Sequence, residues 1–298
     1  MFTACAPAAL DGAGSPQPQF AELNHVFATV DPSTADAIRN SEFLRRFANL
    51  EVRTTTGARA TWTGRYLYGR RTYVEFFAPA DFHVNEKPAP VGTWGIALSG
   101  DRPGFNQMIA RRLLAAGHKS FAELDTRKLG EKTVPWFEAL TAISSHGDSG
   151  ALGKTVSVWA MEYQSSYFDL PEAAKEAAEG AHDRISRERY LSDGFASKMM
   201  RDVVEVHFNV SPVDMARIEP LLSAAGYRIS RSADLVTADG DESDFRFSLT
   251  SPASQGLREI RFSLNRPVPQ HAETIGTSRL VVGPDASATW TFKAPSSP

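Results

Sequence analysis

Two short stretches each carry one side chain able to bind a metal ion, set among apolar and aromatic neighbours. Residues 23–30 contain His25, and residues 72–77 contain Glu75. Both stretches are rich in β-branched and aromatic residues, which is typical of strands. If the fold pairs these strands, His25 and Glu75 face the same concave surface. The residue types indicate a candidate site there but do not specify what it acts on.

The elements around this surface follow a β-α-β-β-β order. After the first strand, Asp31 and Pro32 are typical of a helix start, and apolar residues continue at helical spacing to about residue 50. Strands are expected at residues 51–56, 60–68 and 71–79. The pattern restarts with a strand at 93–99, a helix at 105–116 and strands at 135–143 and 156–164.

The same order is expected again nearer the C-terminus. Residues 203–210 predict a strand, 215–225 a helix, and 227–229, 235–238 and 244–250 further strands. A shorter fourth copy covers 257–264, 278–282 and 288–292. Such a repeat predicts an α+β fold with curved, half-open mixed sheets in two double-unit domains. The expected organisation is a disordered tether at 1–20, paired units at 21–170, a helical connector at 171–200 and a shorter second domain at 201–298.

Composition narrows the functional classes. Of the 298 residues 42% are hydrophobic and 22% charged, with a net charge of −3, which is typical of a soluble globular protein. The absence of a basic run argues against nucleic acid as a partner, since phosphates require a positive face. No apolar run is long enough to cross a bilayer.

The single cysteine, Cys5, follows small residues and precedes a Pro/Gly-rich stretch. This resembles the end of a bacterial lipoprotein signal, which predicts an extracytoplasmic protein attached to a membrane through a lipid on Cys5. The charged start and apolar stretch of a signal are missing. The alternative is a cytoplasmic protein with an incidental cysteine.

Three segments together resemble the vicinal oxygen chelate superfamily, which includes glyoxalase I and the extradiol dioxygenases. They are Leu23-Asn24-His25-Val26, Tyr73-Val74-Glu75-Phe76 and Gly95-Ile96-Ala97-Leu98. The resemblance covers residues 23–164 well and 203–292 loosely, and its short motifs indicate a superfamily, not one member. It implies paired units whose sheets curl around a divalent metal.

Carried over by position, the resemblance makes His25, Glu75 and Glu162 metal ligands, and Glu162 and Tyr163 catalytic. The fourth ligand position falls near Gly95, which has no side chain to offer. Three ligands and a water would still suit a Lewis-acid metal, here Fe, Mn, Zn or Ni. The alternative is that His25 is a hydrogen-bonded core residue and that the two glutamates pair with arginines such as Arg65 or Arg71.

Aromatic residues predict a ligand surface beside this site. Trp62, Tyr66 and Tyr68 share one strand face, and together with Trp94 they are expected to contact substrate. In the third unit Glu205 and His207 lie two residues apart and form a second-site candidate. The alternative for that pair is a polar face at the contact between the domains.

Two functions from different classes follow. The first is a metal-dependent lyase, isomerase or dioxygenase acting on a small oxygen-rich molecule. The second is a non-catalytic protein that binds a small-molecule ligand with the same fold. The missing fourth ligand favours the second, and an oligomeric assembly or a purely structural role is left open.

Overall fold

Two curled eight-stranded sheets form the protein. The computed structural model describes residues 18–57, 60–84, 86–143, 155–171, 184–191 and 193–293. Cys5 and most of the predicted tether and helical connector lie outside these ranges. Within them, no helix combines the length and the apolar character that a membrane span requires.

The first sheet combines two β-α-β-β-β units. One contains β1 (Glu22–Thr29), α1 (Pro32–Asn40), α2 (Glu42–Phe47), β2 (Asn49–Thr56), β3 (Thr61–Tyr68) and β4 (Tyr73–Phe77). The other contains β7 (Trp94–Ser99), α3 (Phe105–Ala115), β8 (Lys119–Leu129), β9 (Lys132–Ile143) and β10 (Val156–Tyr163). The strand order is β2-β3-β4-β1-β7-β10-β9-β8, so the first strands of the two units lie side by side at the centre.

The second sheet has the order β12-β13-β14-β11-β15-β18-β17-β16. Its first unit contains β11 (Met200–Val210), α5 (Pro212–Ala225), β12 (Arg228–Arg231), β13 (Leu235–Asp239) and β14 (Asp244–Leu249). Its second unit contains β15 (Gly256–Leu264), β16 (His271–Ile275), β17 (Ser278–Val282) and β18 (Ser287–Thr291) and has no helix between β15 and β16.

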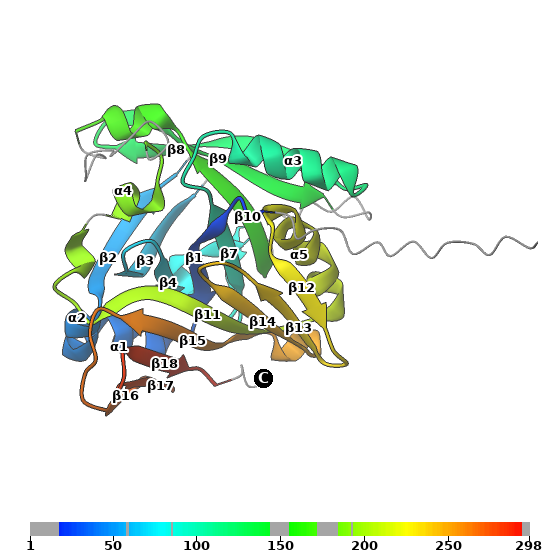
Figure 1. Cartoon of the computed structure of the whole chain (residues 1–298). Coiled ribbons are helices and arrows are strands. Elements are labelled where there is room, and N and C mark those ends of the chain that lie inside the picture. The colour runs from blue at the N-terminus through cyan, green and yellow to red at the C-terminus, as the bar shows by residue number, and fades with distance from the viewer. Residues whose placement is uncertain are drawn as a thin grey trace, which may run out of the picture.

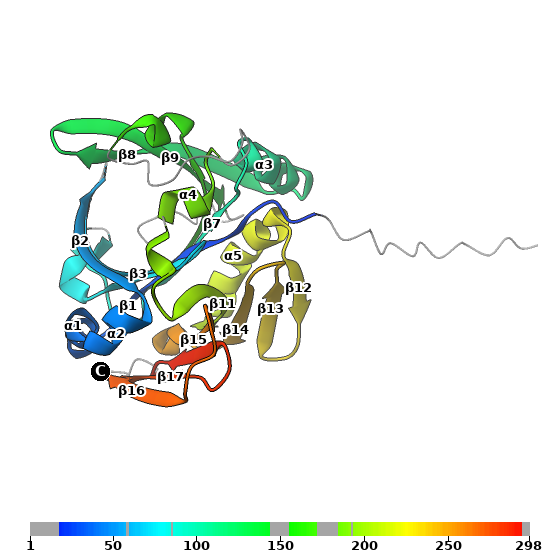
Figure 2. The ribbon, with the colours of Figure 1, turned by 60° about the vertical axis from the view of Figure 1, so that its left-hand side comes forward.

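The two sheets pack against each other through apolar side chains of their central strands (Figure 1). Trp94 of β7 stacks on Phe208 of β11 with ring centroids 4.0 Å apart, and Phe76 of β4 lies 5.1 Å from Trp290 of β18. Helix α5 packs against α3, β9 and β10. One face of the first sheet is thus buried, and its other face curls around an interior of its own (Figure 2).

Short connecting elements complete the chain. A turn formed by the 3-10 segment Pro79–Asp81 and the strands β5 (His83–Val84) and β6 (Lys87–Pro88) follows β4. The 3-10 segment Ser165–Asp169 and the short helix α4 (Arg187–Leu191) follow β10. Figure 2 shows α4 across the open side of the curled first sheet.

The predicted α+β class and curved mixed sheets are confirmed, with local differences. The single helix expected after Asp31 is two helices, because Ser41 ends α1 and its hydroxyl caps α2 by accepting from the Leu44 N–H at 3.1 Å. Strands β8 and β16 are not in the prediction. The domain boundaries at residues 170 and 200 stay a prediction.

Candidate functional site

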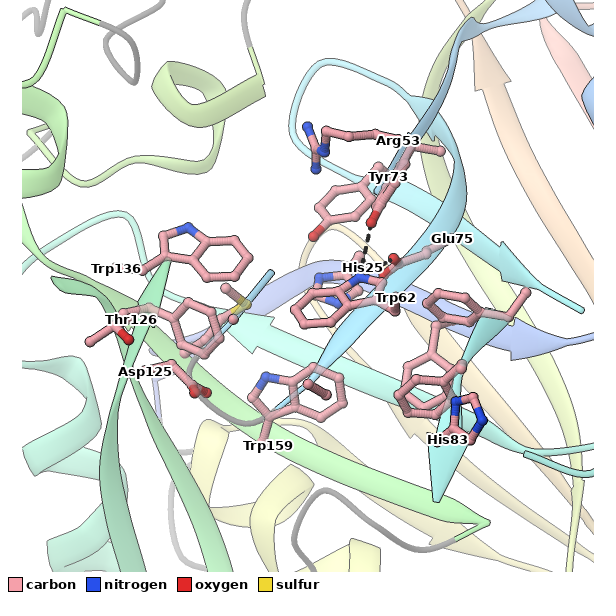
Figure 3. A pocket seen from close by; sticks show the side chains of 18 of the residues that line it. His25, Arg53, Trp62, Tyr73, Glu75, His83, Asp125, Thr126, Trp136 and Trp159 are labelled. Carbon is pink, nitrogen blue, oxygen red and sulfur yellow. Dashed lines mark hydrogen bonds between the residues drawn. The ribbon is translucent and has the colours of Figure 1, made fainter. Parts of the chain in front are cut away.

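The curled first sheet encloses a cavity of about 400 Å³, which falls within the usual range for small-molecule pockets. Strands β1, β3 and β4 form one wall, and β9 and β10 form the wall facing it (Figure 3). Most of its lining side chains are aromatic. Those used below are His25, Phe27, Arg53, Trp62, Tyr66, Tyr73, Glu75, Phe82, Trp136, Phe137, Trp159, Met161 and Tyr190.

His25 and Glu75 both lie in the wall of this cavity. On β1 and β4, which pair in parallel, His25 is opposite Tyr73 and Phe27 is opposite Glu75. Because side chains alternate between faces, these four residues share the cavity side of the sheet. The structure therefore brings together the first two residues of the predicted site.

A chain of hydrogen bonds fixes the His25 ring. The Asn24 amide nitrogen donates to the Tyr163 hydroxyl at 3.2 Å, which turns the Asn24 carbonyl oxygen toward His25 Nδ1 at 2.8 Å. Nδ1 must then carry the proton, and Nε2 is left as a hydrogen-bond acceptor. Burial lowers the pKa of His25 to about 3, so the ring stays neutral at physiological pH.

Aromatic packing holds the same ring from both sides. The Tyr73 ring stacks on His25 with centroids 4.4 Å apart, and the Trp159 edge approaches it at 5.4 Å. No described residue bonds to Nε2, so a ligand in the cavity would be the source of a donor.

Glu75 is a buried carboxyl with few polar contacts. Trp62 Nε1 donates to its Oε1 at 3.1 Å, and Tyr66 forms a second hydrogen bond with it. Burial raises its pKa to about 7, although the hydrogen bond with Tyr66, the nearby charge of Arg53 and the Trp62 bond act in the opposite direction. The carboxyl therefore exchanges a proton near neutral pH.

Gly64 makes room for this carboxyl. A Cβ atom at Gly64 would lie 2.6 Å from Glu75 Oε1 and 2.6 Å from the Tyr66 ring. Arg53, on β2, stacks over Tyr66 with 4.6 Å between its guanidinium carbon and the ring centroid. It also pairs with Glu51 at 3.3 Å, so the cation in the cavity wall already has a carboxylate partner.

The prediction that Glu162 completes a metal site is wrong. Its Oε1 accepts from the Gly104 N–H at 2.7 Å and its Oε2 from the Asn106 N–H at 3.0 Å, at the start of α3. Adjacent strand residues point to opposite faces, so Met161, and not Glu162, lies on the cavity side. Tyr163, expected to be catalytic, lies behind the cavity wall and reaches it through Asn24.

The second unit offers no replacement ligands. The Phe27 ring fills the space beside Gly95, where a Cβ atom would be 2.3 Å from Cε1 of that ring. On the cavity side β10 contributes Trp159 and Met161. Among the described residues, no cluster of three His, Cys, Asp or Glu side chains could hold a metal ion. The residues present do not fit the metal centre that the resemblance implies.

Two of the four expected ligand-contacting aromatics line the cavity, and two do not. Trp62 and Tyr66 do. Tyr68 shares their face and stacks on Tyr66 at 5.5 Å, but lies beyond the cavity. Trp94 points the opposite way and is stacked on Phe208 between the sheets.

The alternative explanation for these residues is also only partly right. His25 is a buried, hydrogen-bonded histidine, as that alternative expected. The arginines have other partners, because Arg65 pairs with Asp81 at 2.6 Å and Arg71 with Glu242 at 2.6 Å.

Glu205 and His207 lie in a separate hollow of the second sheet. Glu205 accepts from Arg246 Nε at 2.7 Å and contacts Arg261 Nε at 3.4 Å, and His207 Nε2 lies 2.8 Å from the Ser248 hydroxyl. The expectation that this polar face forms the contact between the domains is wrong, because Phe208, on the opposite face of β11, makes that contact.

The second wall of the cavity could not be found by sequence reasoning about metal ligands. It consists of Trp136, Phe137, Trp159 and Met161, with Tyr190 of α4 beside it. Alternate large apolar residues in the 136–140 and 156–163 segments are the available signal, but a packed core gives the same pattern.

Fold and site together define an α+β protein with two curled mixed sheets, one enclosing an aromatic-lined cavity. A family model described as a family of unknown function (DUF5829) matches residues 23–292, and the chain belongs to this family. A comparison with curated proteins finds no match.

Solved structures share the fold at low sequence identity. A hypothetical protein from Staphylococcus aureus is 10% identical with a TM-score of 0.54, over 86% of this chain and 95% of that one. BphC, a halotolerant catechol dioxygenase, is 9% identical with a TM-score of 0.43, over 93% and 88%. An extradiol ring-cleaving dioxygenase from B. fuscum is 11% identical with a TM-score of 0.38, over 85% and 59%. At these identities the likeness concerns the fold alone.

Proposed function

We propose that this protein binds a flat, largely apolar small molecule in the cavity of the first sheet, without metal-dependent chemistry. The observation that carries the proposal is the composition of the cavity wall. Aromatic rings surround two titratable side chains, of which His25 is neutral and Glu75 is protonated over much of the acidic range. An uncharged aromatic cavity favours a ring system over a strongly hydrated ion.

The ligand should carry at least one O–H or N–H donor. His25 Nε2 is an acceptor inside an apolar wall, and a buried acceptor without a partner costs stability. A ligand that supplies the donor removes this cost, whereas a pure hydrocarbon leaves it in place. Descent from the vicinal oxygen chelate superfamily, with its metal site lost, is part of the proposal.

A matched pair of fluorescent probes tests it. N-phenyl-1-naphthylamine has an N–H group where 1-benzylnaphthalene has a CH₂ group, and both are otherwise apolar. We expect the first to bind about tenfold more tightly, the value of roughly one hydrogen bond. His25→Phe should abolish the preference, and His271→Phe, at a half-exposed position of β16, is the control. Failure of both probes to bind wild-type protein would overturn the proposal.

A metal-dependent lyase, isomerase or dioxygenase remains the second candidate, because His25 and Glu75 line the same cavity. Its test is metal content after incubation with Fe(II), Mn(II), Zn(II) or Ni(II) and removal of the excess. One equivalent that is retained by wild type and lost in His25→Ala and Glu75→Gln supports this candidate. Trace metal that does not change in the variants counts against it.

A further inference from the structure

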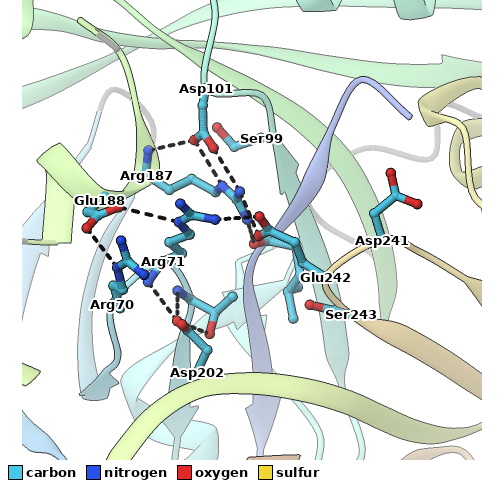
Figure 4. A network of polar contacts seen from close by, with 12 residues as sticks. Arg70, Arg71, Ser99, Asp101, Arg187, Glu188, Asp202, Asp241, Glu242 and Ser243 are labelled. Atoms are coloured by element: carbon cyan, nitrogen blue, oxygen red, sulfur yellow. Dashed lines mark hydrogen bonds and ion pairs between the residues drawn. The ribbon is translucent and has the colours of Figure 1, made fainter. Parts of the chain in front are cut away.

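A buried arginine joins the short helix α4 to both halves of the molecule. Arg187, only 1% exposed, donates from Nε and Nη2 to the two carboxylate oxygens of Asp101 at 3.0 and 2.8 Å. Its Nη1 donates to the Leu23 carbonyl oxygen at 2.9 Å, and its Nη2 also reaches Glu242 Oε2 at 3.0 Å. Asp101 follows β7 of the first sheet, and Glu242 lies in the β13–β14 turn of the second (Figure 4).

The next residue of α4 is held as well. Glu188 pairs with Arg70 at 2.7 Å and Arg71 at 3.4 Å, both in the β3–β4 turn. Arg71 also pairs with Glu242 at 2.6 Å, so this carboxylate from the second half binds two arginines at once. A five-residue helix is not stable by itself, so these ion pairs and its packing determine where α4 lies.

Tyr190 follows Arg187 by three residues and lines the cavity. Its ring stacks on Tyr163 with centroids 4.5 Å apart. Residues three apart in a helix lie on neighbouring parts of its surface, so a shift of Arg187 moves Tyr190 as well.

We propose that Arg187 is a positioning residue that fixes Tyr190 beside the cavity, and that Glu242 makes this position depend on the second half of the molecule. The inference rests on the proposed function, since it concerns the same cavity. It explains why a carboxylate from the second sheet contacts an arginine whose other bonds all go to the first half. A bound ligand is then retained only as firmly as the two halves hold α4.

Glu242→Gln is the informative change. It weakens one contact of Arg187 and leaves both bonds to Asp101, so the guanidinium keeps a charged partner and the fold is retained. We expect N-phenyl-1-naphthylamine to dissociate about tenfold faster in stopped-flow fluorescence, because loss of contacts around a bound ligand acts mainly on the off-rate. Tyr190→Ala should have a similar effect.

The double variant distinguishes positioning from general loosening. If Glu242 acts through Tyr190, adding Glu242→Gln to Tyr190→Ala should change the off-rate little further, whereas independent effects would multiply. The control is Glu219→Gln, which removes an ion pair with Arg231 in the second half, away from α4.

Hydrogen exchange without any probe provides a separate readout. Amides of residues 187–191 should exchange faster in Glu242→Gln than in wild type or Glu219→Gln. Unchanged exchange, or multiplying effects on the off-rate, would overturn the positioning role. If no probe binds but exchange rises as expected, the proposed function fails and the positioning of α4 by Glu242 stands.

Discussion

The two titratable residues of the cavity are uncharged for opposite reasons. Burial removes the proton from the His25 imidazolium and retains the proton on the Glu75 carboxyl, because in each case the charged form is poorly solvated. Below pH 7 the wall therefore contains a neutral acceptor and a largely neutral acid. Proton exchange at Glu75 would be the first change as pH rises, and it would make the cavity less suited to an apolar ligand.

Replacing Glu75 with glutamine should reveal this cost as a pH dependence of stability. The folded pKa of about 7 lies above the ordinary 4.5, so folded protein binds the proton more tightly than the unfolded chain. The stabilising contribution is fully present below about pH 4.5 and is lost as pH rises through about 7. Between pH 5 and pH 8, Glu75→Gln should gain roughly 2–3 kcal/mol relative to wild type.

Urea denaturation at the two pH values measures this difference. Glu42→Gln, which removes a carboxylate whose side chain is 80% exposed in α2, is the control. If the difference between Glu75→Gln and wild type is the same at pH 5 and pH 8, then Glu75 is not the buried, proton-holding group described here.

At the scale of the elements, strand parity decided which predicted residues meet. His25 and Glu75 could be placed together from the sequence, because each lies in a strongly apolar segment with a clear strand pattern. Glu162 could not, because an alignment error of one residue moves a side chain to the other face. Strands β8 and β16 escaped prediction because they are edge strands with many exposed polar residues, which gives no apolar alternation.

The true role of Glu162 is to cap α3. The residue before this helix is Gly104, which has no side chain to cap it, and the Glu162 carboxylate from β10 accepts two of the first N–H groups instead. Glu162→Ala should lower the free energy of unfolding by about 1–3 kcal/mol, and Glu162→Gln by less. Urea denaturation and hydrogen exchange at the start of α3 check this. Unchanged stability, with loss of a bound metal, would instead support the original ligand assignment.

At the scale of the whole molecule, the two sheets share one interior contact. The order of the units along the chain, and hence the curved α+β architecture, could be predicted from the spacing of apolar segments. How the two sheets pack could not, because the face on which Trp94 lies depends on contacts with Phe208, which is more than a hundred residues away. The same contact moved Trp94 from the predicted ligand surface into the core.

Trp94→Ala should therefore weaken the connection between the halves and leave the cavity lining in place. Both Trp94 and Phe208 are fully buried, so the truncation should cost about 3–5 kcal/mol. Wild type should unfold in one transition followed equally by tryptophan fluorescence and far-ultraviolet circular dichroism, whereas the variant should unfold earlier or in two steps. Leu114→Ala, at a position 73% exposed on α3, is the control and should shift stability by less than about 0.5 kcal/mol. Two separate transitions already present in wild type would show that the halves are independent, and the coupling of α4 to the second sheet would then lose its structural basis.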